Sequence, residues 1–187
     1  MPDAPEARGL LALMLHCEAR RQARRAPNGE YVPLSEQDVA LWSRPMIDEA
    51  ERELTAAGQM KAPGRFQLEA AIQSVHAHRV ATGRTDWEEV ALLYEALVRL
   101  APTLGAFVGR AAALGNARGP AAGLAALDAI TPHPAVSYQP YWAVRAHLLA
   151  ALGRTDEARD AYARAIGLSD DERVREFLRE RSGLSRR

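Results

Sequence analysis

Apolar residues recur along most of the chain at the three- and four-residue spacing that is typical of one face of an amphipathic helix. Short polar stretches with prolines and glycines separate these segments. The pattern predicts helices over residues 6–25, 35–57, 66–82, 86–101, 104–117, 120–130, 139–152 and 156–168, with a last helix from Ser169 toward Arg181. Residues 31–34 are expected to be briefly extended.

Several predicted helix limits carry their own signals. A serine or threonine followed three residues later by an acidic residue marks three predicted helix starts, at Ser35, Thr85 and Ser169. Gly58 is the expected end of the second helix, and Pro45 should kink that helix or divide it in two.

The second half of the chain is repetitive. Gly-Arg-Thr-Asp occurs at Gly83 and again at Gly153, and with Gly119 these glycines are separated by 36 and 34 residues. A tetratricopeptide (TPR) repeat is about 34 residues long. The sequence therefore predicts an all-α fold of about three TPR-like helical hairpins, with N-terminal helices and a C-terminal capping helix. We expect one continuous helical domain, made of an N-terminal segment over residues 1–60 and a repeat region over residues 61–187.

Composition supports helices and narrows the class of protein. Apolar residues form 48% of the chain but aromatics only 6%, so the apolar part is mostly alanine and leucine. The 24 basic and 24 acidic residues balance, which leaves no overall positive field to attract nucleic acid. Cys17 is the single cysteine, which excludes an internal disulfide and fits a reducing cytoplasm. The apolar stretch 9–17 is too short to span a bilayer and is interpreted as a buried helix.

No constellation of reactive side chains indicates catalysis. His16, Cys17 and Glu18 are consecutive, so on a helix they point in different directions. His76 and His78 are two residues apart and fail the four-residue spacing of a helical metal pair. We therefore predict that the chain is not an enzyme and holds no metal ion, cofactor or small-molecule substrate.

Two groups of residues are candidates for partner binding. Four arginines at helical spacing would form a basic band at the end of the first helix: Arg20, Arg21, Arg24 and Arg25. The band either complements the helix dipole and is solvated, or it is a docking surface for an acidic partner or a nucleic acid backbone. Asp38 and Trp42 lie four residues apart on the next predicted helix, where Trp42 is favoured as a core residue over a contact residue.

A resemblance to a known family is carried, in order, by runs within residues 5–15, 18–24, 36–42, 66–76, 85–94, 119–122 and 152–158. These runs resemble the C-terminal extension of a group of extracytoplasmic-function (ECF) RNA polymerase sigma factors. In that family the extension follows two promoter-reading regions, is helical and TPR-like, and governs sigma activity through protein contacts.

The resemblance implies that the partners are the sigma-factor core regions and RNA polymerase, with DNA involved only indirectly and no membrane. It adds Gln67 to the candidate contact residues, which already include the arginine band, Asp38 and Trp42. Promoter-reading regions are absent from these 187 residues. The chain is thus expected to be a detached or excised C-terminal part that does not initiate transcription alone.

The alternative is a free-standing TPR adaptor that captures a peptide terminus, with Arg110 or Arg145 binding the carboxylate. A third and weaker alternative, a small hydrolase or transferase, would require an enclosed pocket with convergent polar groups. The reading frame upstream of Met1 distinguishes the sigma-factor regulator from the adaptor, because a sigma core in frame would favour the regulator.

Overall fold

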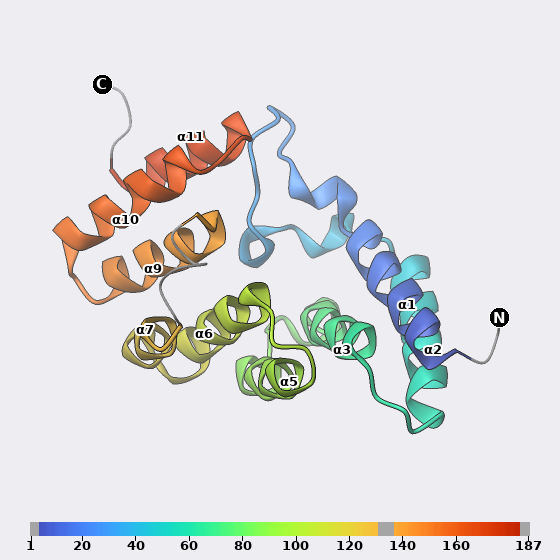
Figure 1. Ribbon diagram of the computed structural model, residues 1–187. Coiled ribbons are helices and arrows are strands. Elements are labelled where there is room, and N and C mark those ends of the chain that lie inside the picture. Colours follow the sequence, from blue (N-terminus) through green and yellow to red (C-terminus); the bar gives the residue numbers. More distant parts are fainter. Residues whose placement is uncertain (1–3, 131–136, 184–187) are drawn as a thin grey trace. The chain divides into compact units, whose positions relative to one another are not determined.

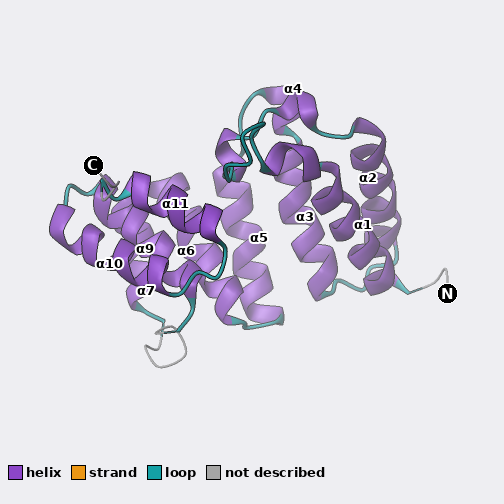
Figure 2. Cartoon of the chain, turned by 90° about the horizontal axis from the view of Figure 1, so that it is seen from above, coloured by secondary structure: helices purple, strands orange, loops and turns teal. Residues whose placement is uncertain are grey.

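The computed structural model describes residues 4–130 and 137–183, and the regular elements in this part are helices (Figure 2). The predicted all-α fold of helical hairpins is confirmed. The described residues form two compact units. One contains the described residues up to Asn28 together with Val32–Ala101, and the other contains Gly29–Tyr31 and the described residues from Pro102 onward.

The first unit has five α-helices and three short 3₁₀ turns among its described residues (Figure 1). In order they are α1 (Pro5–Ala19), η1 (Arg21–Arg24), η2 (Leu34–Glu36), η3 (Val39–Leu41), α2 (Arg44–Gln59), α3 (Arg65–Ala77), α4 (Arg79–Thr82) and α5 (Trp87–Leu100). Helix α1 packs against both α2 and α3, and α3 packs against α5. The first unit therefore extends beyond residue 60, because α3 packs against α1 and α2, and α5 packs against α3.

Helix α1 packs mainly through small side chains, and His16 is buried with them. Its buried residues are Gly9, Ala12, His16 and Ala19. Ala12 meets Ala50 of α2 and Ala70 of α3, and all three are fully buried. A Cβ atom on Gly9 would lie 2.7 Å from the backbone nitrogen of Gln67, so only glycine permits this approach to α3.

Three large apolar residues of α1 lie on the opposite side, whereas Leu13 and Leu15 are partly buried against the alanine cluster. Leu10, Leu11 and Met14 are exposed by 37%, 43% and 60%. The interpretation of stretch 9–17 as a buried helix is thus wrong for these three side chains. Close helix packing favours small residues at the contact. The buried residues at positions 9, 12, 16 and 19 and the exposed ones at 10, 11 and 14 both follow three- and four-residue spacing, so the spacing alone did not distinguish the two sides.

The segment between α1 and α2 differs most from the prediction. Helix α1 ends at Ala19, not at Arg25, and residues 35–57 are not one helix. Instead α2 begins at Arg44 with Pro45 in its first turn. Proline is tolerated there because a backbone N–H in the first turn has no acceptor within the helix. Pro45 therefore starts a helix and kinks none, and Ser35 lies inside a 3₁₀ turn. Gly58 lies within α2, which ends at Gln59.

Turns and caps follow the predicted type with small shifts. Gly83 and Gly153 adopt left-handed φ angles of +71° and +73°, as their place at helix ends predicts. At two of the predicted helix starts the cap is an aspartate: Asp86 accepts a hydrogen bond from Glu89 N at 3.0 Å, and Asp171 accepts one from Arg173 N at 2.8 Å. Thr85 and Ser169 were the wrong residues, because an ionised carboxylate nearer the helix start also complements the helix dipole.

The second unit contains two tight hairpins and a terminal helix. Helices α6 (Leu104–Arg118) and α7 (Pro120–Asp128) form one hairpin, and α9 (Gln139–Ala151) and α10 (Thr155–Gly167) form the other. Helix α11 (Glu172–Arg181) packs on α10 through Leu178, as predicted for a capping helix. The core of this unit includes Leu127, Ala146, Leu149, Tyr162 and Ala165.

Replacing Gly9 by alanine tests the close approach of α1 to α3. We expect Gly9→Ala to lower the free energy of unfolding by about 1–3 kcal/mol, because the new methyl group meets backbone atoms that cannot move aside. Gly58→Ala is the matched control, since no atom lies within 4 Å of its Cβ position in α2. It should stabilise by about 0.5–1 kcal/mol. Urea unfolding followed by circular dichroism measures both; equal effects would contradict the packing.

Candidate functional site

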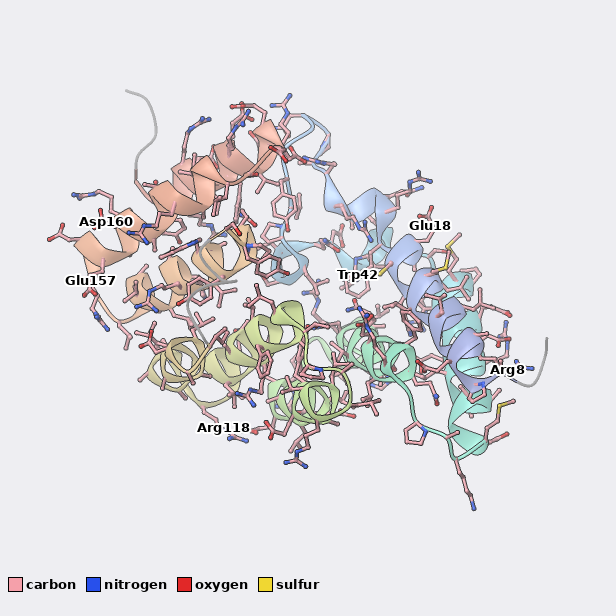
Figure 3. The ribbon with its side chains drawn as sticks, in the orientation of Figure 1. Arg8, Glu18, Trp42, Arg118, Glu157 and Asp160 are labelled. Atoms are coloured by element: carbon pink, nitrogen blue, oxygen red, sulfur yellow. The ribbon has the colours of Figure 1, made fainter. Side chains whose placement is uncertain are left out.

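Trp42 lies at the centre of the region that the sequence singled out (Figure 3). It is only 4% exposed and packs with Ala19, Ile47 and Ala77. The guanidinium carbons of Arg20 and Arg79 lie 5.9 and 5.0 Å from the centroid of its ring, within the range of a cation–π interaction. We call Arg20, Trp42 and Arg79 the arginine stack. The preference for Trp42 as a core residue is confirmed.

Arg79 fixes the segment that precedes Trp42. Its Nη1 donates to the carbonyl oxygens of Leu34 and Ser35 at 2.9 and 3.1 Å, and its Nη2 donates to that of Gln37 at 2.7 Å. One planar guanidinium thus holds three carbonyls of the turn at η2. This role could not be predicted from the sequence, because its acceptors are backbone carbonyls, which every residue type carries, and they lie in a turn far away along the chain.

Arg20 is directed into the unit. Its Nε donates to the carbonyl of His16 at 3.3 Å, and its Nη2 donates to Oε1 of Gln73 on α3. Burial is the main cause that lowers the pKa of this guanidinium. Arg20 therefore connects the end of α1 to α3.

The other three arginines do not complete a basic band. The 3₁₀ turn of η1 has about three residues per turn, so it removes the helical alignment on which the band depended. Arg21 Nη1 pairs with Glu18 Oε1 at 2.9 Å, and Arg24 Nη2 donates to the carbonyl of Cys17 at 2.6 Å. Arg25 is exposed beyond the turn. The predicted geometry of the band is therefore wrong.

Asp38 and Gln67 also have internal partners. Asp38 Oδ1 accepts a hydrogen bond from Ala40 N at 2.9 Å and so caps η3, which means that Asp38 and Trp42 do not share a helix face. Gln67 is 7% exposed, and its Nε2 donates to the carbonyl of Ala62 at 2.7 Å. Gln67 therefore lacks the surface position expected of a contact residue, whereas Asp38 is exposed and its role as a contact residue stays a prediction.

Glu6 is a further residue that the sequence did not single out. Its carboxylate accepts from Phe66 N at 3.0 Å and from Gln67 N at 3.2 Å, at the first turn of α3. A carboxylate at this place satisfies unpaired backbone donors and complements the helix dipole. Glu6 thus fixes the start of α1 against the start of α3, 60 residues away.

His76 faces the arginine stack from α3. It is 8% exposed, and its ring meets that of Trp87 edge to face at 5.3 Å between centroids. Burial, helped by the charges of Arg20 and Arg79, lowers the pKa of His76 to about 4. The imidazole is therefore neutral at physiological pH.

His16 is the second buried histidine of this unit. It is 2% exposed, and its Nε2 lies 3.4 Å from Oε1 of Glu51. Burial lowers its pKa; the charge of Glu51 opposes this shift, and those of Arg20 and His78 add to it. His16 and Cys17 point apart as predicted, since Cys17 is not buried with it.

The described residues hold no group of three histidine, cysteine, aspartate or glutamate side chains that could bind a metal ion. Across the same residues, no helix combines the length and the apolar character needed to cross a membrane.

The second unit contains a pocket of about 340 Å³ between α6 and α7. It is lined by Pro102, Leu104, Phe107, Arg110, Ala126, Ala129 and Ile130. The Arg110 guanidinium lies 5.7 Å from the centroid of the Phe107 ring. Arg145, the other carboxylate-binding candidate, pairs with Asp128 at 2.5 Å.

Comparison with known proteins gives two matches. Residues 1–58, from α1 to near the end of α2, match a family of unknown function, DUF6596. An uncharacterized protein of Rhizobium meliloti (strain 1021) is 41% identical over 178 residues, which are 95% of this chain. The chain spans 42% of the length of that relative. No solved structure gives a significant match.

Loss of the Arg79 fork should release the segment that carries Trp42. We expect Arg79→Met to lower the free energy of unfolding by about 2 kcal/mol or more, because three carbonyls lose a charged donor while the aliphatic stem is kept. The control is Arg84→Met at an exposed position, where about 0.5 kcal/mol or less is expected. Urea unfolding followed by tryptophan fluorescence measures both, and an equal loss in the two variants would refute the role of Arg79.

His76 predicts a dependence of stability on pH. The folded pKa is lowered from 6.5 to about 4, so between these values the unfolded chain binds a proton that the folded chain does not. The free energy of unfolding should therefore fall as pH falls through this interval, by up to about 3 kcal/mol at 1.36 kcal/mol per pKa unit.

The variant His76→Phe keeps an aromatic edge toward Trp87 but cannot bind a proton. Between pH 6.5 and about 4 its free energy of unfolding should fall less than that of the parent chain, by most of the roughly 3 kcal/mol attributed to His76. His147→Phe, at an exposed position on α9, should leave the dependence unchanged. Urea unfolding across this interval checks both variants; the same slope for His76→Phe and the parent chain would contradict the assignment.

Proposed function

We propose that this chain is a regulatory, protein-binding C-terminal domain of an ECF-type RNA polymerase sigma factor, acting in the regulation of transcription initiation. One observation carries the proposal. The runs that resemble this family are spread over some seventy positions in the N-terminal half, yet their residues contact one another in the first unit.

Three of these contacts connect different runs. Glu6 of the first run caps α3 at Phe66 and Gln67 of a later one. Gly9 makes the close approach to Gln67 that no other residue would permit. Arg20 lies over Trp42, which belongs to the run 36–42. The shared residues therefore define a folded core, which supports a resemblance of whole domains over a chance likeness of separate helices.

The length of the relative also supports the proposal. The Rhizobium meliloti protein extends well beyond the part that matches, since this chain covers 42% of it. A domain of this kind is therefore joined to further regions in at least one protein. A C-terminal regulatory domain requires such an arrangement.

The mechanism that we propose is binding with a preference between two states. The domain holds the sigma core or RNA polymerase in an arrangement that permits or blocks promoter engagement, and it contributes no chemical step. A difference of a few kcal/mol in binding free energy between the two arrangements suffices for such control. A rigid N-terminal unit suits this task, because little binding energy is then lost in ordering it.

The adaptor alternative is favoured by one observation, the place of Arg110 at an apolar pocket. Under this alternative, a peptide with a C-terminal leucine and a free carboxylate should bind the purified chain, and its C-terminal amide should not. Arg110→Gln should abolish that difference. Fluorescence anisotropy of the two labelled peptides tests it, and equal binding of acid and amide would eliminate the carboxylate-binding adaptor.

The proposed function predicts the size of the native protein and the proteins that copurify with it. A C-terminal epitope tag at the native locus should reveal a protein larger than 20.4 kDa that copurifies with the β and β′ subunits of RNA polymerase. Removal of the codons for these 187 residues should change transcription from its target promoter. A tagged species of 20.4 kDa without polymerase subunits would instead favour the free-standing adaptor.

A further inference from the structure

Helix α1 has an outward face that nothing in its unit covers. The helix is flanked by α2 and α3 (Figure 1), and its buried residues are Gly9, Ala12, His16 and Ala19. Leu10, Leu11 and Met14 are on the other side and are exposed although they are among its largest apolar residues. We call these three residues the α1 face.

The α1 face is apolar and carries no net charge at its edges. Beyond Met14, the exposed side chains of Glu18 and Arg21 neutralise each other in an ion pair of 2.9 Å (Figure 3 shows Glu18 pointing outward). At the other end, Arg8 pairs with Glu53 of α2 at 2.7 Å. A surface of this composition favours an apolar partner face over an acidic segment or a nucleic acid backbone.

The spacing of the α1 face specifies a helical partner. Leu10 and Leu11 lie four and three residues before Met14, so Met14 adjoins both leucines, and Leu10 with Met14 forms a ridge along the helix. Such a ridge fits the groove between apolar side chains of a second helix. The partner that this surface suits is thus the apolar face of an amphipathic helix.

The size of the α1 face indicates how the partner is supplied. Three side chains fall well short of the roughly 800 Å² per partner that a standard stable interface buries. A second copy of the chain would therefore be held too weakly at this surface. A tethered helix is different, because a short linker gives an effective concentration in the millimolar range. More than half the length of the relative lies outside the matching part, which leaves room for an attached region of this kind.

We propose that the α1 face is the docking site for an apolar helix in a covalently attached region of a longer protein. The identity of that region as the sigma-factor core rests on the function proposed above. Docking there would leave the arginine stack undisturbed as the internal support of α1. It would also explain why the two leucines and the methionine point outward from a helix whose interior is already filled.

The purified 187-residue chain provides the first test. In sedimentation velocity at micromolar concentration we expect a monomer, both for the parent chain and for Leu11→Gln. A dimer that Leu11→Gln dissociates would overturn the proposal, because the occupant would then be a second copy.

Photo-cross-linking in the longer native protein provides the direct test. With Leu11→p-benzoylphenylalanine we expect an intramolecular cross-link to a helix outside these 187 residues. The control, Leu92→p-benzoylphenylalanine at a position 63% exposed on α5, should not reach that helix. Cross-links from position 11 that stay within the 187 residues, that join two molecules, or that are absent would overturn the proposal, as would a native protein without an attached region.

A reporter assay separates this inference from the proposed function. Leu11→Gln with Met14→Gln should reduce the effect of the domain on transcription by about tenfold or more, while the Leu92→Gln control retains it. Thermal stability should not fall, since both side chains are exposed. A domain effect that survives the double variant overturns the docking site and leaves the sigma function intact. A cross-link to an attached region other than a sigma core upholds the docking site and overturns that function.

Discussion

The close approach of α1 to α2 and α3 is the constraint on which the N-terminal unit depends. Gly9 leaves no room for a larger side chain against α3, and Ala12, Ala50 and Ala70 meet in the interior. The contact brings the Glu6 carboxylate onto the first turn of α3. It also leaves Leu10, Leu11 and Met14 of α1 on the outside. The same arrangement of small and large side chains along α1 therefore determines both its packing in the interior and its apolar outer surface.

The arginine stack extends the same unit from packed helices to an irregular segment. Residues 32–43 contain only short 3₁₀ turns, whose backbone groups cannot all pair within the segment. Arg79 supplies donors to three of its carbonyls, and Trp42 provides the apolar anchor that Arg20 covers. Arginines that the sequence suggested for a partner therefore serve in part to hold the domain together. A partner-binding role for the exposed arginines and Asp38 stays a prediction, and the outward side of α1 offers a further surface.

The sequence predicted the hairpins well and the candidate site poorly, for physical reasons. Glycines at Gly83 and Gly153 act locally through their backbone angles, so a local pattern reveals them. Helix α1 carries apolar residues on two sides, and only the partner helices decide that the small ones are buried. The arginine band failed because the helix ends at Ala19 and continues as a 3₁₀ turn. The roles of Glu6 and Arg79 depend on partners 60 and about 45 residues away, beyond the reach of any local pattern.

The central claim is that Leu10, Leu11 and Met14 of α1 face an attached partner. The methyl group of Met14 reports this directly, since it is 60% exposed, while Met46 and Met60 on or next to α2 provide internal references. Line broadening of ¹³C-labelled methionine methyls by a soluble nitroxide measures their accessibility. The account predicts strong broadening of Met14 in the 187-residue chain and its loss in the longer protein, with Met46 and Met60 unchanged. Equal broadening of Met14 in both proteins, or protection already in the isolated chain, would contradict it.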